Sequence, residues 1–343
     1  MVGEASMKKT HNRKQRLIAL SFVVGSVLML IKFLAFWVTR SNAILTDALE
    51  SIVNVVAAGF AWYSIRLASQ PRDINHPYGH GKIEFFSAGF EGGLIIIAGI
   101  LIIYQSISHL IHPAALQQLP TGIVLISVTV VINAILGFWL QNEGKKADSL
   151  TLVADGKHLV TDSLSSLVLV IGVAVIYLTG IRILDSLLSL AFAGYILFSG
   201  FGLVRQSVAG LMDEANTETL QRVLEILRTH RSAAWIDIHN LRVQRYGADL
   251  HIDCHLTLPY YWDLNKVHEE VSTLSDLVTN HFQGSVEFFI HNDPCLPPDM
   301  CRTCHVENCP VRQHPYTQPI EWTTQTLTRN QKHFEQKKTN TVL

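Results

Sequence analysis

The chain has 343 residues, of which 48% are hydrophobic and only 16% are charged, whereas soluble domains average about 25% charged residues. The formal net charge of −1 gives no support to a nucleic-acid partner. Long apolar stretches fill residues 17–204, whereas residues 213–343 have the composition of a soluble protein. The sequence therefore predicts a membrane half followed by an aqueous half, and its 16 histidines favour metal chemistry.

A basic segment, residues 1–16, precedes the first apolar stretch. That stretch is longer than the core of a cleaved signal peptide and lacks a small-residue cleavage site, so we interpret it as an uncleaved first span. A helix needs about 20 mostly apolar residues to cross a bilayer. Six stretches meet this length: 17–38, 43–65, 86–110, 122–140, 152–178 and 183–204. The sequence predicts an all-α, six-helix transmembrane domain over residues 17–210.

Basic residues near the ends of the spans indicate the orientation of the chain. On one side of the predicted domain lie Lys8, Lys9, Arg13, Lys14, Arg16, Arg66, Arg72, Lys82, Lys145, Lys146 and Arg205. The other side has only Arg40 and Arg182. Because basic residues concentrate on the cytosolic side of membrane proteins, both termini are predicted to lie in the cytosol.

Two of the predicted spans carry polar residues that are costly inside hydrocarbon. They are Asp47, Glu50 and Asn54 in the second span, and Asp155, His158 and Asp162 in the fifth. Each set steps by three and then four residues, so it lies along one helical face. We predict that Glu50, Asn54, His158 and Asp162 bind a cation, with Asp47 and Asp155 beside them. The alternative is a structural hydrogen-bond network, but two matched stripes favour a metal site.

The loop after the second predicted span reads QPRDINHPYGHGK, residues 70–82. Its glycines allow a tight turn that brings three candidate metal ligands inward: Asp73, His76 and His80. Two histidines four residues apart are a moderately specific signal for zinc. A solvated loop with incidental histidines is the alternative, and the sequence leaves both open.

The aqueous half has the periodicity of a small α+β domain over residues 211–293, in the ferredoxin-like order α-β-β-α-β. Apolar residues at helical spacing predict helices at 220–227 and 264–278, and alternating ones predict strands at 236–243, 250–258 and 286–290. Proline and polar residues after Asp293 predict an extended, poorly packed tail over residues 294–343.

The predicted tail contains a group of residues of the types that bind metals: Cys295, Cys301, Cys304, His305 and Cys309. A reducing cytosol disfavours disulfides, so we predict a zinc site made of three or four of these residues. The sequence CRTCH also matches the haem-attachment pattern, but that chemistry occurs outside the cytosol. A disordered tail with free thiols is the remaining alternative.

Four segments together resemble the cation diffusion facilitator family, in particular its bacterial zinc and iron efflux pumps. They are SNAILTDALESIVN at 41–54, QPRDINHPYGHGKIE at 70–84, ADGKHLVTDSLSS at 154–166 and HNDPC at 291–295. The resemblance covers about residues 16–295, and its specific parts are HPYGHGK and the HxxxD of the fifth span. It implies a secondary active transporter and not an enzyme. Such a protein is a homodimer in the inner membrane that exchanges a divalent cation for protons and uses no organic cofactor.

The resemblance also assigns roles by position. The transport site corresponds to Glu50, Asn54, His158 and Asp162. The loop site corresponds to Asp73, His76 and His80. A metal site at the dimer interface of the cytosolic domain corresponds to His239, His255, His268, His291 and Asp293, with scattered surface histidines as the alternative. A charge pair that joins the two halves corresponds to Lys82 and Asp213.

The second span departs from the pattern of zinc-transporting relatives, which supply Asp or His followed by Asp. Here Glu50 and Asn54 stand at those positions, so the site carries one fewer negative charge. One imidazole, two carboxylates and an amide suit Zn²⁺, and also Fe²⁺, Co²⁺ or Mn²⁺. The sequence therefore predicts a divalent cation as the substrate and leaves its identity open.

Two rival functions remain. The first is a membrane enzyme, which would be either a redox protein with haem at CRTCH or an intramembrane metal-dependent hydrolase. No HExxH sequence supports the hydrolase. A metal sensor that does not transport is the other rival. Asn54 supports it, whereas the presence of His158 and Asp162 argues against it.

Overall fold

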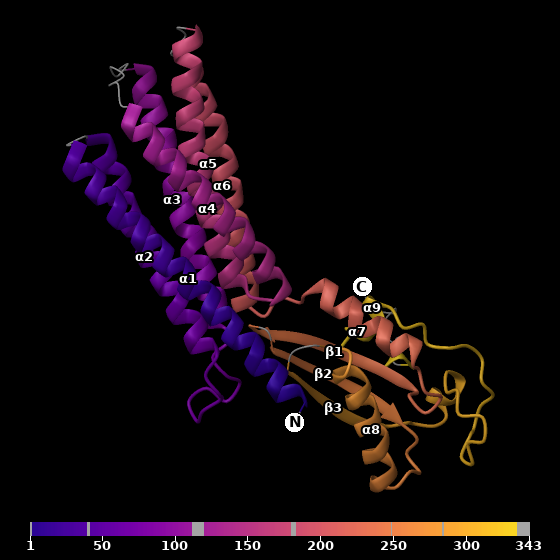
Figure 1. Ribbon diagram of the computed structural model, residues 1–343. Helices are drawn as coiled ribbons and strands as arrows, with labels where there is room; N and C mark the ends of the chain where they lie inside the picture. Colours follow the sequence, from indigo (N-terminus) through magenta and orange to yellow (C-terminus); the bar gives the residue numbers. More distant parts are fainter. Residues whose placement is uncertain are drawn as a thin grey trace. The chain divides into compact units, whose positions relative to one another are not determined.

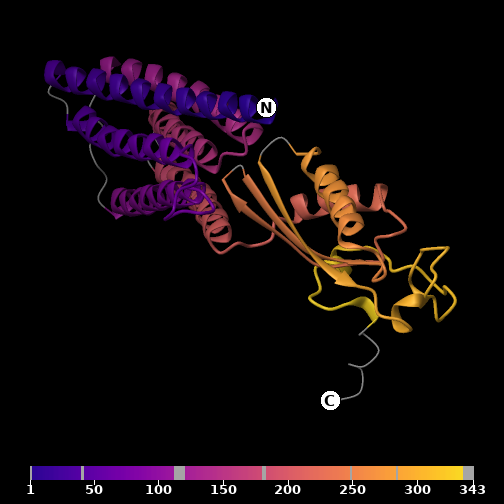
Figure 2. The same ribbon diagram turned by 90° about the horizontal axis from the view of Figure 1, so that it is seen from below.

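A computed structural model describes residues 2–39, 42–111, 120–179, 183–247, 249–282 and 285–334. The chain divides into two compact units, Met1–Met212 and Asp213–Leu343. Each unit is described by itself (Figures 1 and 2). Arg40 and Arg182, the two basic residues predicted for the outer side of the membrane, lie outside the described residues.

In the part of the chain that the structure describes, the first unit is a bundle of six long helices (Figure 1). They are α1 (Val2–Thr39), α2 (Asn42–Ala68), α3 (Ile83–Ile111), α4 (Pro120–Lys146), α5 (Leu150–Thr179) and α6 (Ile183–Leu211). Among the described residues, three stretches are long and apolar enough to cross a membrane: Asn12–Leu34, Ser51–Ala68 and Ile83–Ser108. The prediction of six membrane spans therefore stays a prediction.

Helix α5 packs against helices on several sides in this bundle. Leu152 and Leu159 join a core with α1, α2 and α4, and Ala154 joins another core with α3 and α6. Helices α4 and α5 approach most closely where a Cβ atom on Gly156 would lie 2.6 Å from the carbonyl oxygen of Gly137. A side chain at this point would force the helices apart, so glycine is required. The packing therefore fixes the part of α5 that carries His158.

The described residues of the second unit up to Pro294 form a three-stranded sheet and two helices. Their order along the chain is α7 (Thr217–Thr229), β1 (Asp237–Tyr246), β2 (Asp249–Leu258), α8 (Leu264–Thr279) and β3 (Val286–Pro294). This order confirms the predicted α-β-β-α-β arrangement. Strand β2 lies in the middle, antiparallel to β1 and parallel to β3. The parallel pair requires a crossover connection, and α8 supplies it.

Both helices bury their apolar stripes in one core with the sheet. Helix α7 contributes Val223 and Leu227, both 0% exposed, and α8 contributes Leu274. Each helix begins at a residue whose side chain accepts a backbone hydrogen bond from the first turn, Asn216 for α7 and Asp263 for α8. Such caps satisfy backbone groups that a helix end leaves unpaired, so the local sequence and the packing agree.

In the described residues 294–334, the chain after Asp293 is not the poorly packed tail that the sequence predicts. Ile320, Trp322 and Leu327 are buried in the core of the second unit. The guanidinium of Arg231 lies 4.0 Å from the centre of a Trp322 ring and donates a 2.8 Å hydrogen bond to the carbonyl oxygen of Ile320. The prediction is wrong because these apolar residues follow no helical or strand period, so the pattern that marks the rest of the core is missing.

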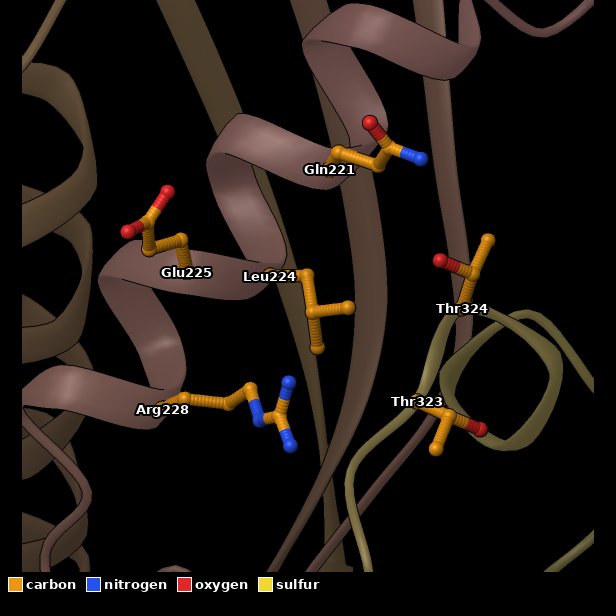
Figure 3. A pocket seen from close by; sticks show the side chains of 6 residues that line it. All are labelled: Gln221, Leu224, Glu225, Arg228, Thr323 and Thr324. Carbon is orange, nitrogen blue, oxygen red and sulfur yellow. The ribbon is translucent and has the colours of Figure 1, made fainter.

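Two short helices interrupt the otherwise irregular tail, a 3-10 helix at Asp299–Arg302 and α9 (Thr324–Leu327). A groove of about 420 Å³ separates α7 from the chain at the start of α9. Gln221, Leu224, Glu225 and Arg228 line one side, and Thr323 and Thr324 line the other (Figure 3). The tail thus lies alongside α7 as a folded part of the second unit.

Candidate metal sites

The polar stripes of α2 and α5 meet inside the first unit. The Nε2 atom of His158 on α5 lies 3.0 Å from Oδ1 of Asn54 on α2. One turn farther along α5, Asp162 accepts a 3.1 Å hydrogen bond from Nδ2 of Asn133 on α4. The structure thus brings His158 and Asn54 together, and it holds Asp162 through a neighbour that the sequence analysis did not identify.

Two buried carboxylates lie near this pair. Glu91 on α3 is 0% exposed, and its Oε2 lies 3.7 Å from Nδ1 of His158. Asp155 is 1% exposed and accepts a 2.7 Å hydrogen bond from Ser21 Oγ on α1. A buried carboxylate is costly without a partner. Neither oxygen of Glu91 accepts a hydrogen bond from the described residues, and only the packing of α3 against α5 shows that the His158 ring lies beside it.

Two further charged residues of the predicted α2 stripe are Asp47 and Glu50, and a lysine lies within the apolar stretch of α1. The side chains of Asp47 and Glu50 lie outside the described part of the chain. Lys32 on α1 is buried, 8% exposed. The structure therefore describes the side chains of three of the four proposed ligands: Asn54, His158 and Asp162.

The loop between α2 and α3 gathers three candidate ligands around one carboxylate. Nδ1 of His76 lies 3.1 Å from Oδ1 of Asp73, and Nε2 of His80 lies 3.4 Å from Oδ2. The backbone N–H of His76 donates to Asp73 and lowers the pKa of this carboxyl below its ordinary value. Gly79, with a φ of +87°, takes a conformation that side chains disfavour. The ligand atoms lie within 4.8 Å of one another, so they can share a cation.

The register of the sheet places three histidines in a row across the second unit. His239 on β1 pairs with His255 on β2, which pairs with His291 on β3. The centres of neighbouring rings are 4.9 Å and 4.6 Å apart. Asp293 lies on the same face of β3 as His291. Its Oδ2 is 3.2 Å from Nδ1 of His255 and 3.7 Å from Nε2 of His239.

The ligand atoms of His239, His255 and Asp293 lie within 4.8 Å of one another, and we call these three residues the sheet site. Burial lowers the pKa of His239, although Asp237 partly opposes this effect. Burial raises the pKa of Asp293, but Lys332, whose Nζ lies 3.0 Å away, lowers it overall. A neutral imidazole and an ionised carboxylate are the forms that bind metals, so the sheet site fits a divalent cation.

Three further residues surround the sheet site, and the sequence analysis did not identify them. Asp237 is 0% exposed, and its Oδ2 lies 3.6 Å from Nδ1 of His239. His333 donates its backbone N–H to Asp237 and also contacts it through its ring. Lys332 contacts Asp293. Lys332 and His333 lie far along the chain from the strands, so nothing in the linear sequence indicates that they reach this place.

Several predicted residues lie apart from these groups. His268 is exposed on α8, and His291 is exposed beside His255. Lys82 and Asp213 belong to different units, so their pairing stays a prediction. The tail residues Cys295, Cys301 and Cys304 are buried, Cys309 is partly buried, and the ring of His305 lies 4.9 Å from that of Tyr316.

Comparison with known families gives two matches that together cover most of the chain. Residues 18–212 match the cation efflux transmembrane domain, and residues 215–295 match the cytoplasmic domain of cation efflux proteins. The first match contains the paired stripes of α2 and α5, and the second contains the sheet site. Neither match includes the chain after residue 295.

Individual relatives align over nearly their whole length. An uncharacterized transporter of Synechocystis is 32% identical over 278 residues, which are 80% of this chain and 89% of the relative. The cation-efflux pump FieF of Citrobacter koseri is 28% identical over 294 residues, 84% of this chain and 96% of that protein. The FieF pump of Yersinia pestis is 28% identical over 285 residues, 83% and 94% of the two chains.

Proposed function

The chain belongs to the cation diffusion facilitator family, and we propose that it exports zinc or iron(II) in exchange for protons, as a homodimer in the cytoplasmic membrane. Membership of the family makes it a membrane transporter of divalent metal cations and not an enzyme. The identity of the ion, the exchange with protons, the dimer and the cytosolic location of both termini are parts of the proposal.

The observation that carries the proposal is the contact between His158 and Asn54 across α2 and α5. An imidazole nitrogen and an amide oxygen 3.0 Å apart come from two helices, with Asp162 one turn away on α5. Glu50 precedes Asn54 by four residues on α2 and is the fourth proposed ligand. Nitrogen and oxygen ligands of this kind suit Zn²⁺ or Fe²⁺ and also admit Mn²⁺ or Co²⁺.

Exchange with protons follows from the same ligands. A metal ion requires a neutral imidazole and ionised carboxylates, so loading releases protons and protonation releases the ion. Histidine is the side chain that ordinarily changes charge near neutral pH. His158 also lies 3.7 Å from Glu91 on α3, so a change in its charge would alter the contacts among α2, α3 and α5. The ion would load from the cytosol and be displaced by protons on the opposite side.

The second unit would hold the two chains of the dimer together and sense the metal. Its match to the cytoplasmic domain of cation efflux proteins supports this role. His291 and His268 are exposed, and we propose that they complete the coordination of ions at the sheet site when two protomers meet. The loop site of Asp73, His76 and His80 would bind a further cation on the cytosolic side.

The proposal is tested by flux in vesicles that contain the purified protein. Uptake of Zn²⁺, Fe²⁺, Mn²⁺ and Co²⁺ is measured with and without an imposed pH gradient, together with the internal pH. We expect the pH gradient to accelerate the uptake of Zn²⁺ or Fe²⁺. We also expect metal uptake to drive protons in the opposite direction. Metal flux without any proton movement would remove the antiport mechanism. Absence of flux for all four ions would favour the non-transporting sensor.

A further inference from the structure

The cysteine-containing part of the tail is folded although it has little regular structure. Residues 295–319 contain one short 3-10 helix, Asp299–Arg302, and no strand, and all of them are described. Cys295, Cys301 and Cys304 are nevertheless only 6–8% exposed. Small loop-rich segments usually need a disulfide or a metal ion to stay folded. All five cysteines of the chain are free, so no disulfide holds this segment.

Two of these sulfur atoms accept hydrogen bonds from backbone N–H groups. Cys295 Sγ accepts from the N–H of Tyr260 at 3.4 Å, and Cys301 Sγ accepts from the N–H of Gln313 at 3.5 Å. Hydrogen bonds to the charged form of a group favour that form, and the thiolate is the form of cysteine that binds metals.

The fold gathers the four tail cysteines. Cys295 and Cys304 share a small apolar cluster with Ile236 and Met300. The side chain of Arg312 donates hydrogen bonds to the carbonyl oxygens of Cys301 and Cys304, and its backbone N–H donates to the carbonyl oxygen of Cys309 at 3.4 Å. One residue therefore ties the backbone of three of the four cysteines together.

The side chain of Arg312 holds the loop that carries the cysteines. Its guanidinium donates to the carbonyl oxygens of Cys301 at 3.0 Å, Cys304 at 3.1 Å and Val306 at 2.5 Å. These bonds satisfy carbonyl groups that no helix or strand pairs. The positive charge also lowers the pKa of Cys304, although burial outweighs this effect. Arg312 would offset part of the negative charge that four thiolates around a dication leave over.

We propose that Cys295, Cys301, Cys304 and Cys309 bind one Zn²⁺ ion in a structural site. An all-thiolate, four-ligand set is typical of closed zinc sites, and the two-residue spacing between Cys301 and Cys304 is common in them. Among the described residues, the groups whose ligand atoms lie within 4.8 Å of one another are the loop site and the sheet site. Binding therefore requires the four sulfur atoms to draw closer together around the ion.

The remaining cysteine and the adjacent histidine are not part of the proposed site. Cys254 is buried on β2 in the main core of the second unit, a different cluster from that of Cys295 and Cys304. His305 packs its ring against Tyr316. The role of the ion would be to close the loop, so that the following residues reach the core at Trp322 and the sheet site at Lys332.

The experiment uses the full-length protein in detergent under reducing conditions. After a wash with a mild chelator that strips weakly held ions, zinc is measured by elemental analysis. We expect one zinc ion per chain in the wild type and its loss in the double variant Cys301→Ser/Cys304→Ser. Cys254→Ala and His305→Ala are the controls, and both should keep the ion.

Cobalt(II) identifies the ligands. Replacement of zinc by cobalt should produce an intense sulfur-to-metal charge-transfer band, which the nitrogen and oxygen ligands of the other sites cannot produce. If the double variant fails to fold, Cys309→Ser, which changes a partly exposed residue, should weaken the band without abolishing it. The proposal is overturned if wild-type protein binds no cobalt with this band, if the Cys309→Ser spectrum is unchanged, or if a haem absorbance appears instead.

Discussion

Two of the three candidate metal sites that the family matches contain, the membrane site and the sheet site, are built on different kinds of secondary structure. In the first unit, His158 and Asn54 project from separate helices and meet through one contact of 3.0 Å. In the second unit, three adjacent strands set His239, His255 and His291 side by side through the backbone register. One arrangement depends on how helices pack, and the other is fixed by hydrogen bonds between strands.

This difference suits two different tasks. A transport site must bind an ion and then release it on the opposite side of the membrane, so ligands on helices that can move relative to one another are an advantage. A sensor needs a site whose geometry persists while its occupancy changes. The sheet site has that property, and the tail adds Lys332 and His333 to its surroundings. The largest effects are expected where the tail packs on the second unit and supports the sheet site.

Removal of the Trp322 side chain should have the largest effect on the second unit. Trp322 is 2% exposed in the core, and truncation of a buried tryptophan to alanine costs about 3–5 kcal/mol. We expect Trp322→Ala to increase amide hydrogen exchange throughout β1, β2 and α7 and to leave α4 and α5 unchanged. Tyr316→Ala, at a residue that is 44% exposed, is the matched control. Unchanged amide exchange in Trp322→Ala would mean that the tail does not contribute to the stability of the second unit.

Asp237→Asn should weaken metal binding at the sheet site. Asp237 lies between His239 and His333, and loss of a carboxylate that orients a ligating histidine costs roughly 10–100-fold in affinity. The measurement is zinc titration against a competing chelator in the His158→Ala/His76→Ala background, which removes the proposed membrane and loop sites, with the tail site already loaded with zinc. Asp276→Asn, on the exposed side of α8, should leave the affinity unchanged. Equal affinities in the two variants would contradict a supporting role for Asp237.

Lys332→Met should have a smaller effect of the opposite sign. The Lys332 ammonium lies 3.0 Å from Asp293 and competes with a cation for that carboxylate. A partly exposed ion pair is worth at most about 1 kcal/mol, so zinc should bind about fivefold more tightly in the variant. The control is Lys266→Met. Lys266 lies on α8, and its ammonium contacts the ring of Trp262, which precedes the helix. Weaker zinc binding in Lys332→Met would show that the lysine organises the site and does not compete.

The pH dependence of the metal-free unit should show the smallest effect. Burial lowers the pKa of His239, so the unfolded chain binds a proton at this imidazole at a higher pH than the folded unit does. The contribution of His239 to stability is therefore present above about pH 6.5, the ordinary histidine value, and is lost as the pH falls toward the lowered value. His239→Gln should make amide exchange in β1 less sensitive to pH over this range. An unchanged pH profile would contradict the assignment.

Much of the fold follows from periodicity in the sequence. The α-β-β-α-β order of the second unit is visible because its helices and strands each bury one regular face. The packing of the tail is not visible, because Ile320, Trp322 and Leu327 belong to no periodic element. Burial of such residues depends on contacts with Arg231 and α7, which lie far away in the chain.

The candidate sites also contain some residues that sequence spacing indicates and others that only the packing shows. The meeting of the α2 and α5 stripes could be predicted because spacing of three and four residues places the candidate ligands of each stripe on one helical face. The partners of those ligands, Glu91 and Asn133, come from α3 and α4, and only the packing of the helices reveals them. Asp237 could not be predicted because its importance depends on the strand register and on His333 from the tail.

We propose that the ion crosses the membrane through the site of His158 and Asn54, whereas the sheet site senses the metal. The most direct measurement is metal flux at saturating metal in vesicles that contain wild-type protein, His158→Ala, Ser163→Ala or His255→Ala. Ser163 is buried on the same helix but bonds only to the Leu159 carbonyl of that helix, so it serves as the control. The account predicts background flux for His158→Ala and near wild-type flux for the other two variants. Wild-type flux in His158→Ala, or loss of flux in His255→Ala alone, would contradict it.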